Sequence, residues 1–189
     1  ADNPLVLPVD QYFNVKGIGL VAIGYVQAGM VNVHDELMLL PANGSGTAKS
    51  LQVMDDDVAS AVAGDRVGLA LRNVKEEHLT GSTIIVHPVR EDKHTNTTIP
   101  LSVNQHTSSV VNLKVSPFQK RVLAVGDVVH ASVDLQFVVG RITEVDGTKL
   151  TITWESPLFI RVNNAPPVLI AQLDSSPRIM GSSVLENAS

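Results

Sequence analysis

Three consecutive carboxylates, Asp55, Asp56 and Asp57, form the densest group of possible metal ligands in the sequence. Calcium and magnesium prefer sites that supply several carboxylate oxygens. However, successive side chains of an extended segment point to opposite sides, so three adjacent residues cannot all face one ion. The favoured interpretation is a solvated loop, and we assign no metal ligand.

Histidine, cysteine and serine offer no better site. No two histidines are two or four residues apart, which argues against a local zinc site. The chain has no cysteine, which excludes thiolate ligands and disulfides and fits a cytoplasmic protein. No serine lies in a G-x-S-x-G nucleophile elbow, so we assign no catalytic residue. The six histidines are His34, His78, His87, His94, His106 and His130.

The chain also lacks the sequence motifs that bind nucleotide phosphates. A P-loop GTPase needs a glycine-rich loop with a lysine for the phosphates and a carboxylate for Mg²⁺. Neither G-x-x-x-x-G-K-[ST] nor the guanine-reading N-K-x-D occurs in this sequence. The chain by itself is therefore not expected to bind or hydrolyse GTP.

A glycine-rich hairpin near the start is the element around which the sequence is organised. Apolar and β-branched residues dominate residues 20–26, which predicts a half-buried strand. Gly17 and Gly19 give the backbone freedom for a tight bend before that strand. Residues 27–29 are predicted to form the next turn, and residues 36–40 the following strand.

This hairpin resembles the start of the second domain of translational GTPases of the elongation factor Tu group. The family pattern G-x-G-x-x-x-x-G-x-V-x-x-G-x-[IV]-x-[VI]-x-[DE]-E is matched by Gly17, Gly19, Gly24, Gly29, Val33 and Glu36. A second block, A-G-x-x-V-G-x-x-L-R-x-[IV]…G, follows within residues 63–81. The second half of the chain resembles the third domain more weakly, through Val125-Gly126-Asp127 and Arg178-Ile179-Met180-Gly181.

Within this group, the sequence is most similar to the SelB branch. That branch includes the selenocysteine factor and archaeal SelB-like factors, one of which is proposed to serve pyrrolysine. The resemblance implies an all-β chain of two consecutive β-barrels that bind aminoacyl-tRNA. It implies a linker at residues 1–8 from a missing upstream G domain, a domain 2-like barrel at 9–89 and a domain 3-like barrel at 90–189. GTP and Mg²⁺ would bind in that G domain. The resemblance also implies the ribosome as a partner and a cytoplasmic location.

Composition and strand spacing agree with this class. The chain is 44% hydrophobic but only 4% aromatic, so its core must be aliphatic. No apolar run reaches the roughly 18 residues of a membrane helix, and we expect no membrane partner. One helical turn is expected at 74–79, a polar connection at 90–98 and a hairpin turn at Asp146-Gly147. Strands of the second unit are expected at 98–103, 110–115, 128–135, 138–145, 149–154, 158–162, 168–173 and 178–185.

Charge restricts how the chain could meet RNA. It carries 14 basic and 19 acidic residues, a net charge of -5. Free-standing nucleic-acid binders usually carry a basic excess, because phosphate contacts supply much of the affinity. Any RNA contact must therefore be local or shared with another domain. Two alternatives stay open: a gamma-subunit-like archaeal initiation factor that holds initiator tRNA, and a protein-interaction β module with no RNA role.

The resemblance also implies where the aminoacyl end of tRNA would bind. Phe13 would stack on the terminal adenine, or else belongs to the core. Met54 would line an adaptable apolar surface, or else packs inside. Ile23 would line the pocket, or else is a buried residue of its strand. Carried over residue by residue, the pocket positions are Gln11, Phe13, Ile23, Gln52, Met54 and Arg66.

Arg66 stands where ordinary elongation factors have a neutral amide. In the selenocysteine branch a basic residue in this region is thought to attract the anionic selenol. The His and Asp that accompany it there are replaced here by Ile23 and Gln11, which favours a large or neutral amino acid over selenocysteine. The alternative is a surface ion pair of Arg66 with Asp65 or another nearby aspartate.

Three basic residues of the second unit could contact the backbone of a tRNA stem, with a solvated surface as the equal alternative. They are Lys114, Lys120 and Arg121.

The missing phosphate loop gives a direct prediction. Calorimetric titration of this chain with GTP and Mg²⁺ is expected to give no binding, because nothing in the sequence can cradle a triphosphate. Micromolar binding would contradict this interpretation.

Overall fold

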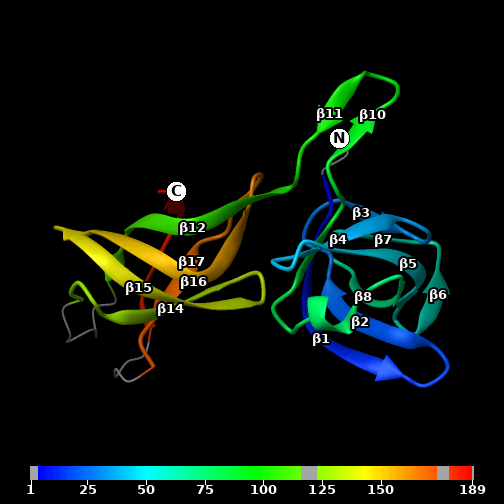
Figure 1. The fold of residues 1–189 in the computed structure, drawn as a ribbon, viewed down its shortest axis with the longest axis horizontal. Coiled ribbons are helices and arrows are strands. Elements are labelled where there is room, and N and C mark those ends of the chain that lie inside the picture. The colour runs from blue at the N-terminus through cyan, green and yellow to red at the C-terminus, as the bar shows by residue number, and fades with distance from the viewer. Residues whose placement is uncertain (1–3, 116–122, 174–178, 189) are drawn as a thin grey trace. The chain divides into compact units, whose positions relative to one another are not determined.

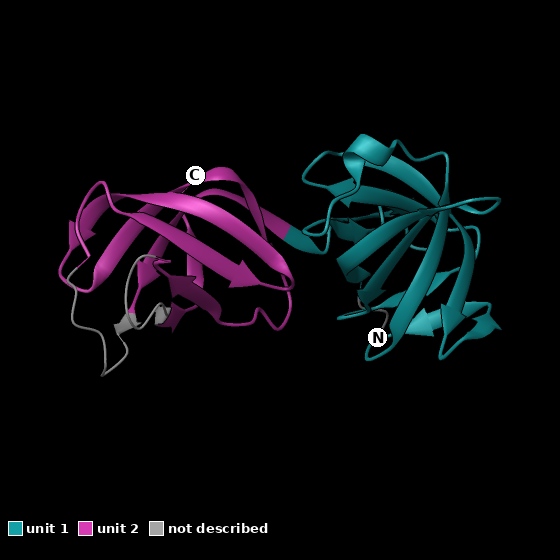
Figure 2. Cartoon of the chain, turned by 90° about the horizontal axis from the view of Figure 1, so that it is seen from below, with its two compact units in different colours: residues 1–103 teal, residues 104–189 magenta. Residues whose placement is uncertain are grey.

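A computed structural model of the chain describes residues 4–115, 123–173 and 179–188. The chain divides into unit 1, residues 1–103, and unit 2, residues 104–189 (Figure 2). Each unit consists almost entirely of β-strands (Figure 1). The predicted all-β fold of two barrels is confirmed.

Unit 1 is a barrel because its sheet closes on itself. The strand order is β4-β9-β1-β2-β8-β5-β6, and β4 also pairs with β5, which joins six strands into a ring. A small ribbon of β3 and β7 and the hairpin β10–β11 complete the unit. The strands are β1 (Val6–Val15), β2 (Gly19–Tyr25), β3 (Met30–Asn32), β4 (Glu36–Leu40), β5 (Gly44–Val53), β6 (Asp56–Val58), β7 (Ser60–Val62), β8 (Arg66–Arg72), β9 (Ile84–Val86), β10 (Arg90–Asp92) and β11 (Thr97–Ile99).

The barrel interior of unit 1 is aliphatic, as predicted. Strand β2 alternates strictly between buried and half-buried residues. This is the pattern of a strand with one face on a core. A 3₁₀ turn, η1 (Glu76–His78), lies within the helical turn expected at 74–79. Fully buried side chains include Leu7, Leu39, Leu51, Leu69 and Ile85.

Gly24 is required where two strands approach closely. Strand β1 pairs first with β9, through Val6–Pro8, and then with β2, with a register shift between Val9 and Gln11. A Cβ atom at Gly24 would clash with the backbone oxygen of Pro8. The bend that carries β1 from one partner to the other therefore depends on a residue without a side chain.

Unit 2 contains one eight-stranded sheet with the order β13-β18-β17-β14-β15-β16-β12-β19. Its core mixes aliphatic residues such as Ile142, Ile152 and Ile170 with Trp154. The predicted hairpin turn joins β15 to β16, but its two turn residues are Gly147, at φ 60°, and Thr148, while Asp146 still pairs with Lys149. The strands are β12 (Val103–Asn112), β13 (Lys114–Val115), β14 (Val128–Val133), β15 (Gln136–Asp146), β16 (Lys149–Arg161), β17 (Val168–Ala171), β18 (Ile179–Ser183) and β19 (Leu185–Asn187).

Three expectations about strands were wrong. The strand expected at 98–103 is not formed, because β11 ends at Ile99 and β12 begins only at Val103. Residues 90–98 were expected to be a connection but form most of the hairpin β10–β11, whose turn is fixed by the Asp92 carboxylate accepting the His94 N–H at 2.9 Å. The structure also has one strand, β16, where two were expected at 149–154 and 158–162. The side-chain amide of Gln136 bonds both backbone groups of Phe159, at 2.8 and 2.9 Å, and so stabilises the second half of β16.

The boundaries of the units also differ from those expected from the sequence. Strand β1 begins at Val6, inside the segment interpreted as a linker. The hairpin β10–β11 groups with unit 1, so the division falls between Val103 and Asn104 rather than near residue 90. Ser102 stabilises this end of unit 1 by donating its hydroxyl to the backbone oxygen of Leu5 at 2.7 Å.

A buried polar network lies inside unit 2. The Trp154 indole N–H donates to Ser109 Oγ at 2.9 Å, and Ser109 Oγ lies 2.8 Å from His106 Nδ1. The serine hydroxyl can donate to this ring nitrogen only while the nitrogen carries no proton. His106 is 3% exposed, and its burial lowers the pKa of the imidazole below the usual 6.5.

This network predicts that unit 2 loses stability in mild acid. Below pH 6.5 His106 takes up a proton in the unfolded chain more readily than in the folded chain. The free energy of unfolding therefore decreases as the pH is lowered, by at most about 1.4 kcal/mol per pH unit. Denaturant unfolding between pH 7.5 and 5.5 measures this fall. His106→Gln is expected to remove part of it, whereas the exposed control His94→Gln should leave it unchanged. An identical pH dependence in His106→Gln would contradict the prediction.

Candidate functional site

Four residues on neighbouring strands form a row across the outside of the unit 1 barrel. Gln11 on β1 is paired with Ile23 on β2, Ile23 with Gly68 on β8, and Gly68 with Gln52 on β5. Residues paired directly across neighbouring strands share one face of a sheet. The next residues along these strands, such as Leu69 and Leu51, are buried, so this outer row faces away from the core.

Gly68 leaves the middle of the outer row without a side chain. A Cβ atom there would lie 3.9 Å from Gln52 Cβ, which is ordinary contact distance. The backbone of β8 is therefore open to an approaching group between the side chains of Ile23 and Gln52. Gly68 belongs to the second family block in the sequence, but its type alone did not predict that it lies in the candidate site.

Arg66 lies on the same face of β8, two residues before Gly68. Its guanidinium carbon is 5.5 Å from the centroid of the Tyr25 ring, and Nη1 donates to the Tyr25 hydroxyl at 3.3 Å. The ion pair with Asp65, considered as an alternative, is not formed in the structure. Asp65 Oδ2 instead accepts the Val62 N–H at 2.9 Å.

Phe13 and Met54 lie at the surface and not in the core. Phe13 is 46% exposed on β1, beyond Gln11 on the same face of the strand. Met54 is 90% exposed in the turn between β5 and β6, where Met54 and Asp55 both have left-handed backbone conformations, with φ 52° and 65°. Four of the six predicted pocket positions thus lie on β1, β2 and β5, and Met54 and Arg66 lie beside them.

The aspartate run is divided between a turn and a strand. Asp57 Oδ1 accepts the Gln52 side-chain N–H at 3.1 Å, so this carboxylate supports the outer row. Asp55 lies in the turn and Asp56 begins β6. In the part of the chain that the structure describes, no group of three or more His, Cys, Asp or Glu residues could hold a metal ion.

The basic residues proposed for unit 2 are only partly described. Lys114 pairs through its backbone with Ser182 in β18. Lys120 and Arg121 lie outside the described residues. No helix among the described residues is long and apolar enough to cross a membrane.

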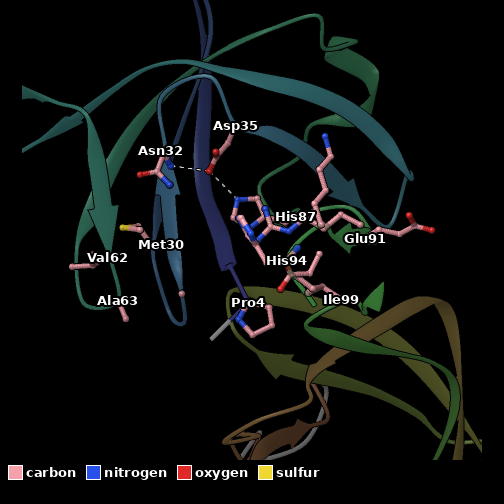
Figure 3. A pocket seen from close by; sticks show the side chains of 14 residues that line it. Pro4, Met30, Asn32, Asp35, Val62, Ala63, His87, Glu91, His94 and Ile99 are labelled. Carbon is pink, nitrogen blue, oxygen red and sulfur yellow. Dashed lines mark hydrogen bonds and ion pairs between the residues drawn. The ribbon is translucent and has the colours of Figure 1, made fainter. Parts of the chain in front are cut away.

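A groove of about 1090 Å³ lies elsewhere in unit 1, between the β3–β7 ribbon and the hairpin β10–β11 (Figure 3). Met30 and Val62 of the ribbon and Ile99 of the hairpin provide apolar lining, and Glu91 and His94 add polar groups. The sequence did not predict this groove, because its lining residues come from segments that lie far apart in the chain.

A histidine and a carboxylate meet at the wall of this groove. His87 Nε2 lies 2.9 Å from Asp35 Oδ2, and the same oxygen accepts the Asn32 N–H at 2.8 Å (Figure 3). Their side chains are only 14% and 24% exposed. The pair joins the turn before β4 to the segment after β9, and this position gives it a structural role.

Comparisons with known proteins agree on the family. The family described as elongation factor Tu domain 2 matches residues 19–85. The solved apo structure of translation elongation factor SelB from Methanococcus maripaludis matches with a TM-score of 0.77 and 26% identity, over 99% of this chain and 43% of that one. The two units are similar to domains 2 and 3 of a SelB-like translational GTPase.

Two curated relatives are similar to parts of this chain. The selenocysteine-specific elongation factor of Methanocaldococcus jannaschii is 43% identical over 43% of this chain and 17% of its own length. An uncharacterized protein of the same organism is 28% identical over 84% of this chain and 47% of its own length. The chain therefore spans less than half the length of either relative.

The Asp35–His87 contact predicts a loss of stability in one variant. Asp35→Ala removes the acceptor of both the Asn32 N–H and His87, and is expected to cost about 1–3 kcal/mol of unfolding free energy. Chemical denaturation measures the loss. The neighbouring exposed Glu36→Ala is the control and should cost much less. Equal losses in the two variants would show that the contact contributes little.

Proposed function

We propose that the two β domains hold aminoacyl-tRNA, and that the outer row with Arg66 and Phe13 receives its aminoacyl end. The observation that carries the proposal is the register across β1, β2, β8 and β5, which places Gln11, Ile23 and Gln52 in one line. The SelB-like family membership supplies the class of ligand.

The chemistry of the row suits an aminoacyl ester. Arg66 offers guanidinium donors for the ester oxygens or the terminal ribose. Phe13, exposed on the same face, offers a ring on which the terminal adenine can stack. Gln52 donates its amide N–H to Asp57, so its oxygen stays free to accept a hydrogen bond.

Gly68 would let the ligand approach the backbone of β8 in the middle of the row. The amino acid itself is best neutral, because Ile23 and Gln11 replace the His and Asp of the selenocysteine branch. Both apolar and hydrogen-bonding groups would then meet the esterified side chain.

The remaining partners follow from the family. A G domain in the same protein would bind GTP and Mg²⁺ and couple nucleotide state to tRNA binding. Lys114, Lys120 and Arg121 would contact the tRNA stem, and the ribosome would receive the complex in the cytoplasm. Initiator tRNA, held by a gamma-subunit-like factor, is the alternative within the family.

The proposal predicts weaker and less selective tRNA binding in two variants. On the GTP-loaded protein that includes the G domain, Arg66→Ala is expected to lose about 1.5–3 kcal/mol of binding to charged tRNA, because a charge-assisted hydrogen bond disappears. Phe13→Ala should lose roughly 1–3 kcal/mol if the ring stacks on a base. Filter binding of charged and uncharged tRNA measures both.

Matched controls are available in the chain. Arg90→Ala removes an exposed arginine outside the outer row, and Phe137→Ala removes a phenylalanine that is 51% exposed in unit 2. Both should keep the wild-type preference for charged tRNA. If Arg66→Ala and Phe13→Ala fold normally and keep that preference too, the outer row is not the aminoacyl site. A wild-type protein that binds no tRNA would instead favour a protein-interaction module.

A further inference from the structure

We propose that Tyr25 is a positioning residue for Arg66: it holds the guanidinium on the outer face of β8, beside Gly68, before the aminoacyl end of tRNA arrives. This inference rests on the proposed function but concerns a residue that the sequence did not single out. Tyr25 and Arg66 are 41 positions apart and meet because β2 and β8 are neighbours.

Two contacts fix the side chain of Arg66. Its guanidinium carbon lies 5.5 Å from the Tyr25 ring centroid, within the range of a cation–π interaction. Nη1 also donates to the Tyr25 hydroxyl at 3.3 Å. Among the described residues, the Arg66 side chain makes no other hydrogen bond or ion pair, so Tyr25 is its one polar and cation–π partner there.

The backbone that carries Arg66 is fixed independently. The Val26 N–H donates to the Asp65 backbone oxygen at 2.9 Å, and the Gly64 N–H to the Val26 oxygen at 2.9 Å. The Asp65 carboxylate closes the same turn by accepting the Val62 N–H. Tyr25 therefore controls the direction of the Arg66 side chain without being needed to place its Cα atom.

The contact leaves most of the guanidinium available to a ligand. Arginine has five N–H donors in a planar fork, and the Tyr25 hydroxyl uses one of them. The Asp65 carboxylate accepts the Val62 N–H and forms no ion pair with Arg66. A restrained arginine loses less conformational entropy when it binds than a mobile one does. The remaining donors can thus reach an ester or ribose oxygen at a smaller entropic cost.

A double-mutant cycle on the GTP-loaded protein with its G domain tests this role. Tyr25→Ala is expected to weaken binding of charged tRNA roughly three- to tenfold, as the loss of one pre-ordered side chain implies. In an Arg66→Ala background the same change should have no effect, because there is no guanidinium left to position. Tyr25→Phe keeps the ring and should fall between wild type and Tyr25→Ala.

Controls separate this role from general damage to the fold. Tyr12→Phe, on the neighbouring strand, removes a tyrosine hydroxyl and should leave tRNA binding unchanged. Equal losses from Tyr25→Ala in both backgrounds, or no loss in either, overturn the proposal. If Arg66→Ala abolishes the preference for charged tRNA while Tyr25→Ala keeps wild-type affinity, the aminoacyl site stands and the positioning role alone fails.

A second measurement does not depend on tRNA. In this 20.2 kDa chain, NMR relaxation of the Arg66 Nε–H should show an ordered side chain in wild type and a mobile one in Tyr25→Ala. An Arg66 side chain that is equally mobile in both proteins overturns the proposal even if tRNA binding fails altogether.

Discussion

The pairing of β4 with β5 is the constraint on which the candidate site depends. Glu36 to Leu39 pair with residues 44–47, and this pairing closes the ring of strands in unit 1. In a closed barrel each strand has two fixed neighbours, so no strand can slip without displacing the rest. A slip of one residue would turn Gln52 or Arg66 toward the core. Closure therefore fixes which side chains a ligand meets.

Local hydrogen bonds bear on how an acidic chain can present a cation. Unit 1 contains most of the aspartates, yet Asp65, next to Arg66 in the sequence, accepts the Val62 N–H and closes the turn before β8, and Asp57 accepts the Gln52 amide across the β5–β6 hairpin. Neither carboxylate forms an ion pair with Arg66 in the structure. The guanidinium is left against an uncharged ring, where its donors remain accessible.

Local patterns in the sequence predicted the barrels well but not the contacts between distant segments. The glycine-rich hairpin, the alternation in β2 and the hairpin turn at Gly147 follow from short-range rules of backbone conformation and burial. The Tyr25–Arg66 and Asp35–His87 contacts join residues 41 and 52 positions apart, and no periodicity reveals such pairs. The hairpin β10–β11 was missed because its residues are polar, and its turn depends on a hydrogen bond that the Asp92 carboxylate accepts from the His94 N–H. The continuous β16 was predicted as two strands, which lie on either side of Pro157 in the observed strand.

The distribution of aromatic residues gives each unit its own optical signal. Trp154, the only tryptophan in the sequence, is buried in unit 2, where its indole N–H bonds Ser109. Both tyrosines, Tyr12 and Tyr25, belong to unit 1. Indole emission therefore reports the state of unit 2 alone, while phenol emission from tyrosine reports unit 1. The unmodified chain already carries the two probes needed to learn whether its barrels unfold together or one after the other.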